Sequence, residues 1–123
     1  VVDRKTATRA LDKLAKIGRE NVRKLLVDSG VTPEASDSLI DICQIQAASS
    51  KELQEKLPGS LRLNELGTKG LEELSFLIDN LSAVTFSSGK VIADLGIIRG
   101  LDYYTGSIFE VTWEPFRNLG SIA

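Results

Sequence analysis

The chain has 123 residues, of which 42% are hydrophobic and 26% charged, and a formal net charge of −2 at neutral pH. This balance is typical of a soluble globular protein with a modest core. No apolar run approaches the ~18 residues of a membrane span and no signal peptide is visible, so we expect a soluble, cytoplasmic protein. The absence of histidine excludes a Ser-His-Asp triad and a zinc site with histidine ligands, and the lone Cys43 excludes an intrachain disulfide.

The first four-fifths of the chain have the periodicity and punctuation of helices. Candidate N-caps are Asp3, Thr32 (followed by a proline), Ser50 and Thr68, and Gly18 offers a stop between the first two helices. We expect helices, in chain order, over residues 4–17, 19–28, 33–46, 51–57 and 69–81. Because the chain also lacks methionine, we expect it to be an internal piece of a longer protein.

The character of the sequence changes near residue 85. Residues 90–98 and 107–113 are rich in β-branched and aromatic side chains, and both read as strands. Since the connection between them is short and has glycines near both ends, the simplest geometry is an antiparallel pair. The sequence therefore predicts an α+β fold, with a helical segment over residues 1–84 and antiparallel strands over residues 85–123.

Charge is unevenly distributed along the chain. The first 24 residues contain three acids against a larger set of bases: Arg4, Lys5, Arg9, Lys13, Lys16, Arg19, Arg23 and Lys24. Residues 28–80 are correspondingly rich in acids. A basic helix of this kind faces either a phosphate backbone or solvent, where it can pair with the acidic middle of the same chain. The sequence leaves both readings open.

The connection over residues 99–106 has the composition of a site. It contains Arg99, Asp102, Tyr103 and Tyr104 between two apolar strands. An arginine offers a fixed cation with five donors to a carboxylate or phosphate, and adjacent tyrosines on an extended backbone point to opposite sides. From composition alone, a binding site and a structural Arg99–Asp102 pair flanked by packing tyrosines are equally good interpretations.

The residues Arg-Gly-Leu-Asp-Tyr-Tyr-Thr-Gly at 99–106, followed by Ile-Phe-Glu at 108–110, resemble the histidine-specific signature of histidyl-tRNA synthetases at every position. Upstream, residues 10–18 resemble the Asp-Lys-Leu-x-Lys helix that leads into the insertion domain of that family. The two matches have the order and distance that the family requires. Together they cover the chain as one continuous stretch.

This resemblance implies a class II aminoacyl-tRNA synthetase that activates histidine with ATP, accompanied by Mg²⁺, and transfers it to tRNA. It implies that Arg99 is catalytic, beside the histidine carboxylate and the α-phosphate, and that Tyr103 and Tyr104 bind the imidazole. It also brings the basic segment near the tRNA acceptor arm, which makes Lys5, Arg9, Lys13, Lys16, Arg19, Arg23 and Lys24 candidate tRNA-facing residues. The intact protein would be a homodimer without a protein-held metal site.

Two other interpretations stay open. The synthetase-like regulatory subunit of ATP phosphoribosyltransferase shares the fold and often the Tyr-Tyr-Thr-Gly core. A helical protein-interaction module would account for the first eighty residues and leave the loop unexplained. No ATP-binding arginine motif or anticodon-binding domain is found in the sequence, so we expect these 123 residues alone to bind no cofactor and to be inactive.

Overall fold

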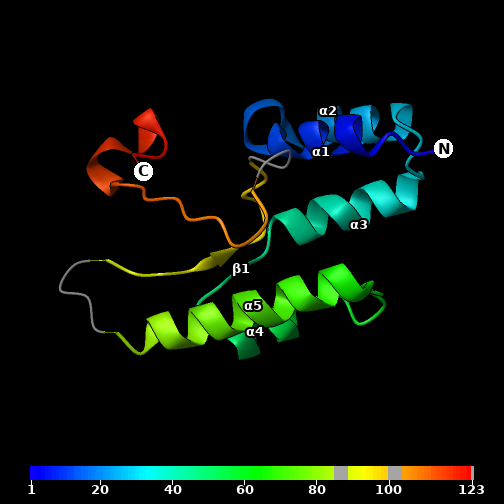
Figure 1. The fold of residues 1–123 in the computed structure, drawn as a ribbon. Helices are drawn as coiled ribbons and strands as arrows, with labels where there is room; N and C mark the ends of the chain where they lie inside the picture. The colour runs from blue at the N-terminus through cyan, green and yellow to red at the C-terminus, as the bar shows by residue number, and fades with distance from the viewer. Residues whose placement is uncertain (85–88, 100–103, 123) are drawn as a thin grey trace.

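A computed structural model of the chain describes residues 1–84, 89–99 and 104–122. It consists of two helical groups joined by a short sheet, with a C-terminal segment that extends to one side (Figure 1). None of the helices among these residues is long and apolar enough to cross a membrane. Helices together with an antiparallel pair of strands confirm the α+β class.

The first helical group is formed by α1 (Arg4–Asp12), α2 (Leu14–Asp28) and α3 (Pro33–Cys43). The side chain of Asp3 accepts a hydrogen bond from the Thr6 amide and caps α1, as predicted. Gly18 interrupts α2 with φ 79°, a conformation that glycine adopts without a steric penalty, so the chain turns back where the sequence indicated a stop. The core of this group is formed by Ala7, Ala10, Leu11, Val22, Leu26, Val31 and Ile40.

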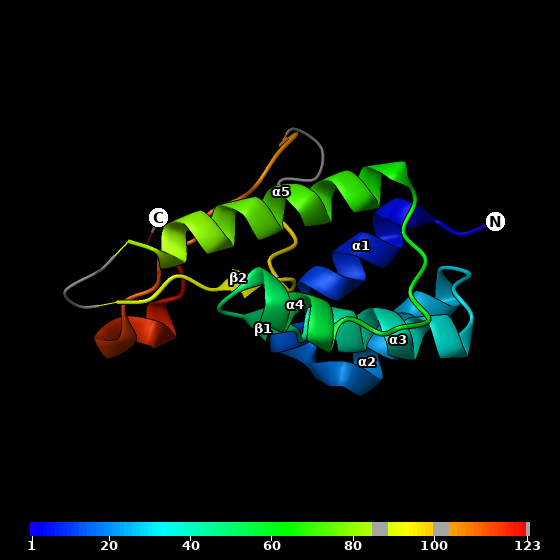
Figure 2. The ribbon, with the colours of Figure 1, turned by 90° about the horizontal axis from the view of Figure 1, so that it is seen from below.

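The second group is formed by α4 (Ser50–Lys56) and α5 (Glu65–Ser82), which pack against each other around the fully buried Leu53 and nearly fully buried Ile78 (Figure 2). Two predicted caps are wrong. Ser49, not Ser50, accepts from the amide of Glu52, and Asn64, not Thr68, caps α5 through a 2.8 Å bond from the Gly67 amide. Helix α5 therefore begins one turn before the predicted start.

The short sheet pairs β1 (Gln46–Ala47) antiparallel with β2 (Ala93–Asp94). Two predictions are therefore wrong: the helix expected to reach residue 46 ends at Cys43, and residues 90–98 do not pair with residues 107–113. Thr112 instead forms an isolated bridge with Ser121, on either side of the 3₁₀ helix η1 (Glu114–Leu119). Among the described residues, no further strand pairs with β1 or β2.

The sheet crosses the predicted division between residues 84 and 85. The Gln46 side-chain amide donates to the Asp94 carboxylate over 2.7 Å, and the Leu95 amide donates to the Ile45 carbonyl over 3.1 Å. Ile98 packs against the core of the first helical group. These contacts hold the segment that precedes Arg99 against the helices. The proposed boundary itself, at residues 85–88, lies outside the described residues.

Candidate functional site

The signature segment is described at both of its ends. Residues 100–103, including the candidate Tyr103, lie outside the described residues. Arg99 follows Ile98, and its Nε lies 2.9 Å from Glu110 Oε1 in an ion pair. The Arg99 side chain is 62% exposed, whereas that of Glu110 is 19% exposed. Tyr104 is 57% exposed. The loop therefore begins with a cation whose outer part is accessible to an anion.

The residues that follow Tyr104 line an open cavity of about 410 Å³. One wall is a face of α5, and the opposite wall is formed by β2 with the turn after it and by Thr105, Gly106, Ser107 and Ile108. Both charged and apolar side chains of α5 contribute, among them Lys69, Glu73 and Leu74. The cavity places a concave surface beside the C-terminal end of the signature loop.

The seven candidate tRNA-facing residues divide into two sets. Lys5, Arg9, Lys13, Lys16 and Lys24 are exposed and take part in no salt bridge within the described part of the chain. Lys5 and Arg9 lie one helical turn apart in α1. Lys13 is the residue between α1 and α2, and Lys16 belongs to the first turn of α2. These five exposed bases, which we call the basic row, therefore follow an interrupted helix.

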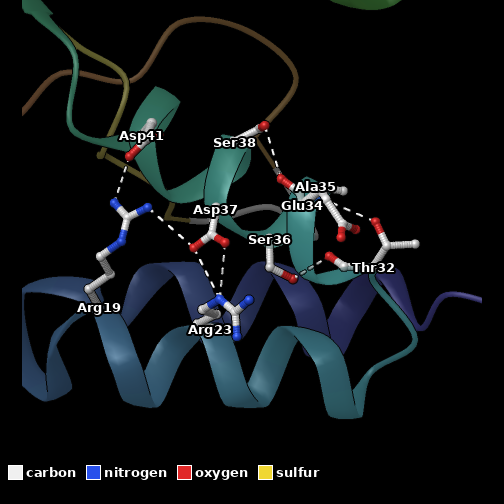
Figure 3. A network of polar contacts seen from close by, with 9 residues as sticks. All are labelled: Arg19, Arg23, Thr32, Glu34, Ala35, Ser36, Asp37, Ser38 and Asp41. Atoms are coloured by element: carbon white, nitrogen blue, oxygen red, sulfur yellow. Dashed lines mark hydrogen bonds and ion pairs between the residues drawn. The ribbon is translucent and has the colours of Figure 1, made fainter.

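The second set consists of Arg19 and Arg23, which bind acids of α3 (Figure 3). Arg19 donates to Asp41 over 2.6 Å and to Asp37 over 3.3 Å. Arg23 Nε donates to both Asp37 oxygens at 3.1 Å. These contacts lower the pKa of Asp37, chiefly through Arg23, and the hydrogen bond that Arg19 donates to Asp41 raises the pKa of Arg19. Both arginines are thus engaged in joining α2 to α3.

Two sets of ion pairs in this region were not predicted from the sequence. Glu110 was recognised as part of the signature but not as the partner of Arg99. The pairing of Arg19 and Arg23 had a signal in the sequence, because the two arginines are four residues apart, as are Asp37 and Asp41, and each pair therefore shares a helix face. Two such faces brought together predict an interhelical salt bridge.

Metal ligands are not grouped in the described part of the chain. Within residues 1–84, 89–99 and 104–122, no three side chains of histidine, cysteine, aspartate or glutamate lie close enough together to hold an ion. Cys43 is half-buried against the first core, and burial raises the pKa of its thiol. It therefore behaves as a packing residue.

Comparison with known proteins identifies the relatives of the chain. A histidine–tRNA ligase of Bifidobacterium animalis is 38% identical over 124 aligned positions, which cover 93% of this chain and 26% of that protein. The corresponding figures are 36%, 98% and 28% for the Finegoldia magna ligase, and 44%, 85% and 22% for that of Phocaeicola vulgatus. No family model matches the chain, and neither does any solved structure.

The chain thus spans about a quarter of the length of the curated relatives that it matches. Nothing among these relatives favours the regulatory-subunit interpretation. The match extends over nearly all of the chain, helices and signature segment alike. Over nearly all of its length, the chain is similar to one continuous segment of histidine–tRNA ligases.

Proposed function

We propose that the chain is the histidine-binding segment of a histidine–tRNA ligase, which activates histidine with ATP and transfers it to tRNA. The observation that carries this proposal is the complete signature from Arg99 to Glu110 in a chain whose relatives are ligases of this name. In the first step the histidine carboxylate attacks the α-phosphate of ATP, giving histidyl-adenylate and pyrophosphate. In the second step the histidyl group passes to the terminal adenosine of the tRNA.

Arg99 would act at the point where negative charge accumulates. As a carboxylate oxygen attacks the α-phosphate, charge grows on the phosphate oxygens, and a fixed cation placed there stabilises the transition state more than the ground state. The outer part of the Arg99 side chain is accessible, and its guanidinium can donate to carboxylate and phosphate together. We therefore assign Arg99 as the catalytic residue of this segment.

Tyr104 would hold the imidazole of the substrate, with Tyr103 beside it in the same pocket. A neutral imidazole has one nitrogen that donates and one that accepts, and a phenol can do either. A pocket built to pair with both nitrogens rejects amino acids that lack them, because its polar groups would be left unpaired. The cavity that begins at Thr105 supplies concave surface beside this position.

The remaining parts of the proposal follow from the family. We assign residues 1–84 to the helical region that includes the insertion domain, and residues 85–123 to a class II catalytic domain that functions as a homodimer. Mg²⁺ would accompany the phosphates of ATP, since the described residues form no ligand cluster of their own. No step assigned to these residues depends on the ion.

The substitution Tyr104→Phe tests the proposed substrate in a full-length ligase that contains this segment. Only the hydroxyl is lost, so histidine binding should weaken by about 1–3 kcal/mol while ATP binding is nearly unchanged. The measurement is the Michaelis constant for each substrate in histidine-dependent ATP–pyrophosphate exchange. Equal weakening of both substrates would assign Tyr104 to the fold and leave Tyr103 as the ligand for the imidazole.

The basic row is proposed as a contact for the tRNA acceptor arm. We restrict this proposal to Lys5, Arg9, Lys13, Lys16 and Lys24, because Arg19 and Arg23 are already bound to α3. Lysine contacts to phosphates add affinity without reading sequence, and they weaken as salt is added.

Charge reversal tests this contact. Lys13→Glu combined with Lys16→Glu should raise the Michaelis constant for tRNA and flatten its salt dependence, while histidine-dependent exchange is retained. Lys51→Glu combined with Lys90→Glu, at two exposed lysines outside the cavity, is the matched control. A tRNA response equal to that of the control at low salt would make the row a solvated surface.

A further inference from the structure

The ion pair between Arg99 and Glu110 differs from an ordinary surface pair in its burial. Glu110 is the more buried partner, at 19% exposure against 62% for Arg99. Exposure alternates along this stretch: Ser107, Phe109 and Val111 are exposed, whereas Ile108 and Glu110 are half-buried. Ile108 lines the cavity beside α5. A less exposed carboxylate therefore faces a more exposed arginine in this pair.

The atoms that form the pair leave the rest of the guanidinium available. The ion pair joins Arg99 Nε to Glu110 Oε1 over 2.9 Å. Within residues 1–84, 89–99 and 104–122, Arg99 forms an ion pair with Glu110 and with no other residue, so its two Nη groups can donate to an anionic ligand. Because a guanidinium is planar, fixing Nε fixes the plane and direction in which the two Nη groups donate. Glu110 thus orients the guanidinium and leaves its two Nη groups available to a ligand.

The pair also closes the signature loop. Arg99 is the first residue of the signature and Glu110 is its last, so their contact brings its two ends together. The Arg99 end is itself held, because Ile98 packs against the core of α1, α2 and α3. An arginine that is fixed in both position and direction can stabilise a transition state without first reorganising.

We propose that Glu110 is the positioning residue of Arg99 in histidine activation. This inference rests on the proposed function, because it assigns a role within the same reaction. Loss of the carboxylate would let the long arginine side chain take other rotamers, and the displacement of an orienting group by about an ångström can cost up to about 100-fold in rate. Glu110 itself touches neither ATP nor histidine in this proposal.

The test uses a full-length ligase that contains this segment and compares Glu110→Ala with Glu110→Gln. Glu110→Ala should lower kcat of histidine-dependent pyrophosphate exchange about tenfold or more, with a smaller change in the Michaelis constant for ATP. Glu110→Gln keeps an oxygen that can accept from Nε, so it should recover most of that loss. Glu72→Ala, an exposed acid of α5, is the matched control and should leave exchange unchanged.

A second comparison separates positioning from folding. In an Arg99→Ala background, Glu110→Ala should add little further loss of kcat, since its target is already gone. A further loss as large as in the wild-type background, or a glutamine variant as slow as the alanine variant, would overturn the proposed role. Exchange by the Arg99→Ala variant at the wild-type rate would instead contradict the proposed function. If Arg99→Ala lowers kcat and Glu110→Ala does not, only the positioning role is contradicted.

Discussion

Gly96 lies where the chain after β2 passes close to the end of α3. A Cβ added there would sit 2.6 Å from the Cys43 carbonyl oxygen and 3.0 Å from Asp94 Oδ1. The carbonyl is backbone and cannot move aside as a flexible side chain could. Asp94 is also fixed, because it accepts from the Gly96 amide and from the Gln46 side chain over 2.7 Å each. The absence of a side chain at Gly96 therefore permits the contact between β1 and β2.

Gly96→Ala should accordingly destabilise the chain by about 1–3 kcal/mol, the usual range for an overpacked position. Equilibrium unfolding in urea measures the change. Gly70→Ala is the matched control, because nothing lies within 4 Å of the added carbon and alanine favours the helical conformation of α5. An alanine at position 96 that is tolerated as well as one at position 70 would contradict the observed approach of the two segments.

At the scale of single elements, the N-terminus of α5 gives the clearest prediction. Asn64 accepts from the Gly67 amide, whereas the Thr68 side chain accepts no hydrogen bond from the described residues. Asn64→Ala should therefore cost about 0.5–2 kcal/mol of stability, the usual cost of losing such a cap. Thr68→Ala, in the helix interior, should be close to neutral. The measurement is the free energy of unfolding of each variant. A larger loss for Thr68→Ala than for Asn64→Ala would identify Thr68 as the cap.

The contact between α2 and α3 makes a prediction about acid. Arg23 and Arg19 hold the pKa of Asp37 below its ordinary value of about 3.9, so the folded state binds a proton there less readily than the unfolded state. The resulting stability is fully present above pH 3.9 and is lost as the pH falls through the lower folded-state pKa.

Asp37→Asn removes this contribution at neutral pH. The stability gap between the wild type and Asp37→Asn should therefore be present at pH 6 and close as the pH approaches 2. Glu72→Gln, at an exposed site of α5, should show no such closing gap. A gap for Asp37→Asn that is constant with pH would mean that its charge contributes nothing to the contact. Urea unfolding at each pH supplies the comparison.

The elements that sequence could predict are those governed by local signals. Asp3, Thr32 and Gly18 act through side-chain caps or backbone conformation within a few residues, and all three predictions are confirmed. The Ser49 cap had such a signal too, because Glu52 three residues later forms the Ser-x-x-Glu pattern and binds the Ala48 amide. Strand pairing depends on distant partners. Nothing local in residues 46–47 indicates that they bind residues 93–94.

At the scale of the whole molecule, the C-terminal segment differs from the helical groups. Its large apolar side chains are exposed, among them Phe109, Val111, Trp113 and Leu119. Trp113 and Phe116 contact each other, with ring centroids 4.8 Å apart, but they have no core to enter. The strand predicted over residues 107–113 is not formed, apart from the isolated bridge at Thr112. Strands need neighbours, and the described residues supply none for this segment.

The candidate site, like the fold, could be predicted only in part from the sequence. The matched signature identified Arg99, Tyr103 and Tyr104 as a group, because a motif names residues irrespective of their neighbours. It could not reveal that Glu110 binds Arg99, nor that Arg19 and Arg23 are engaged with α3. Those contacts depend on how separate elements approach in space.

The most direct test of the account is histidine-dependent ATP–pyrophosphate exchange by the Arg99→Ala variant of a full-length ligase that contains this segment. Adenylate formation requires no tRNA, so the assay isolates the step assigned to Arg99. Arg4→Ala, an exposed arginine of α1, is the matched control. The account predicts a loss of at least ~100-fold for Arg99→Ala in a folded protein and near wild-type exchange for Arg4→Ala. Exchange by folded Arg99→Ala at the rate of the control would contradict it.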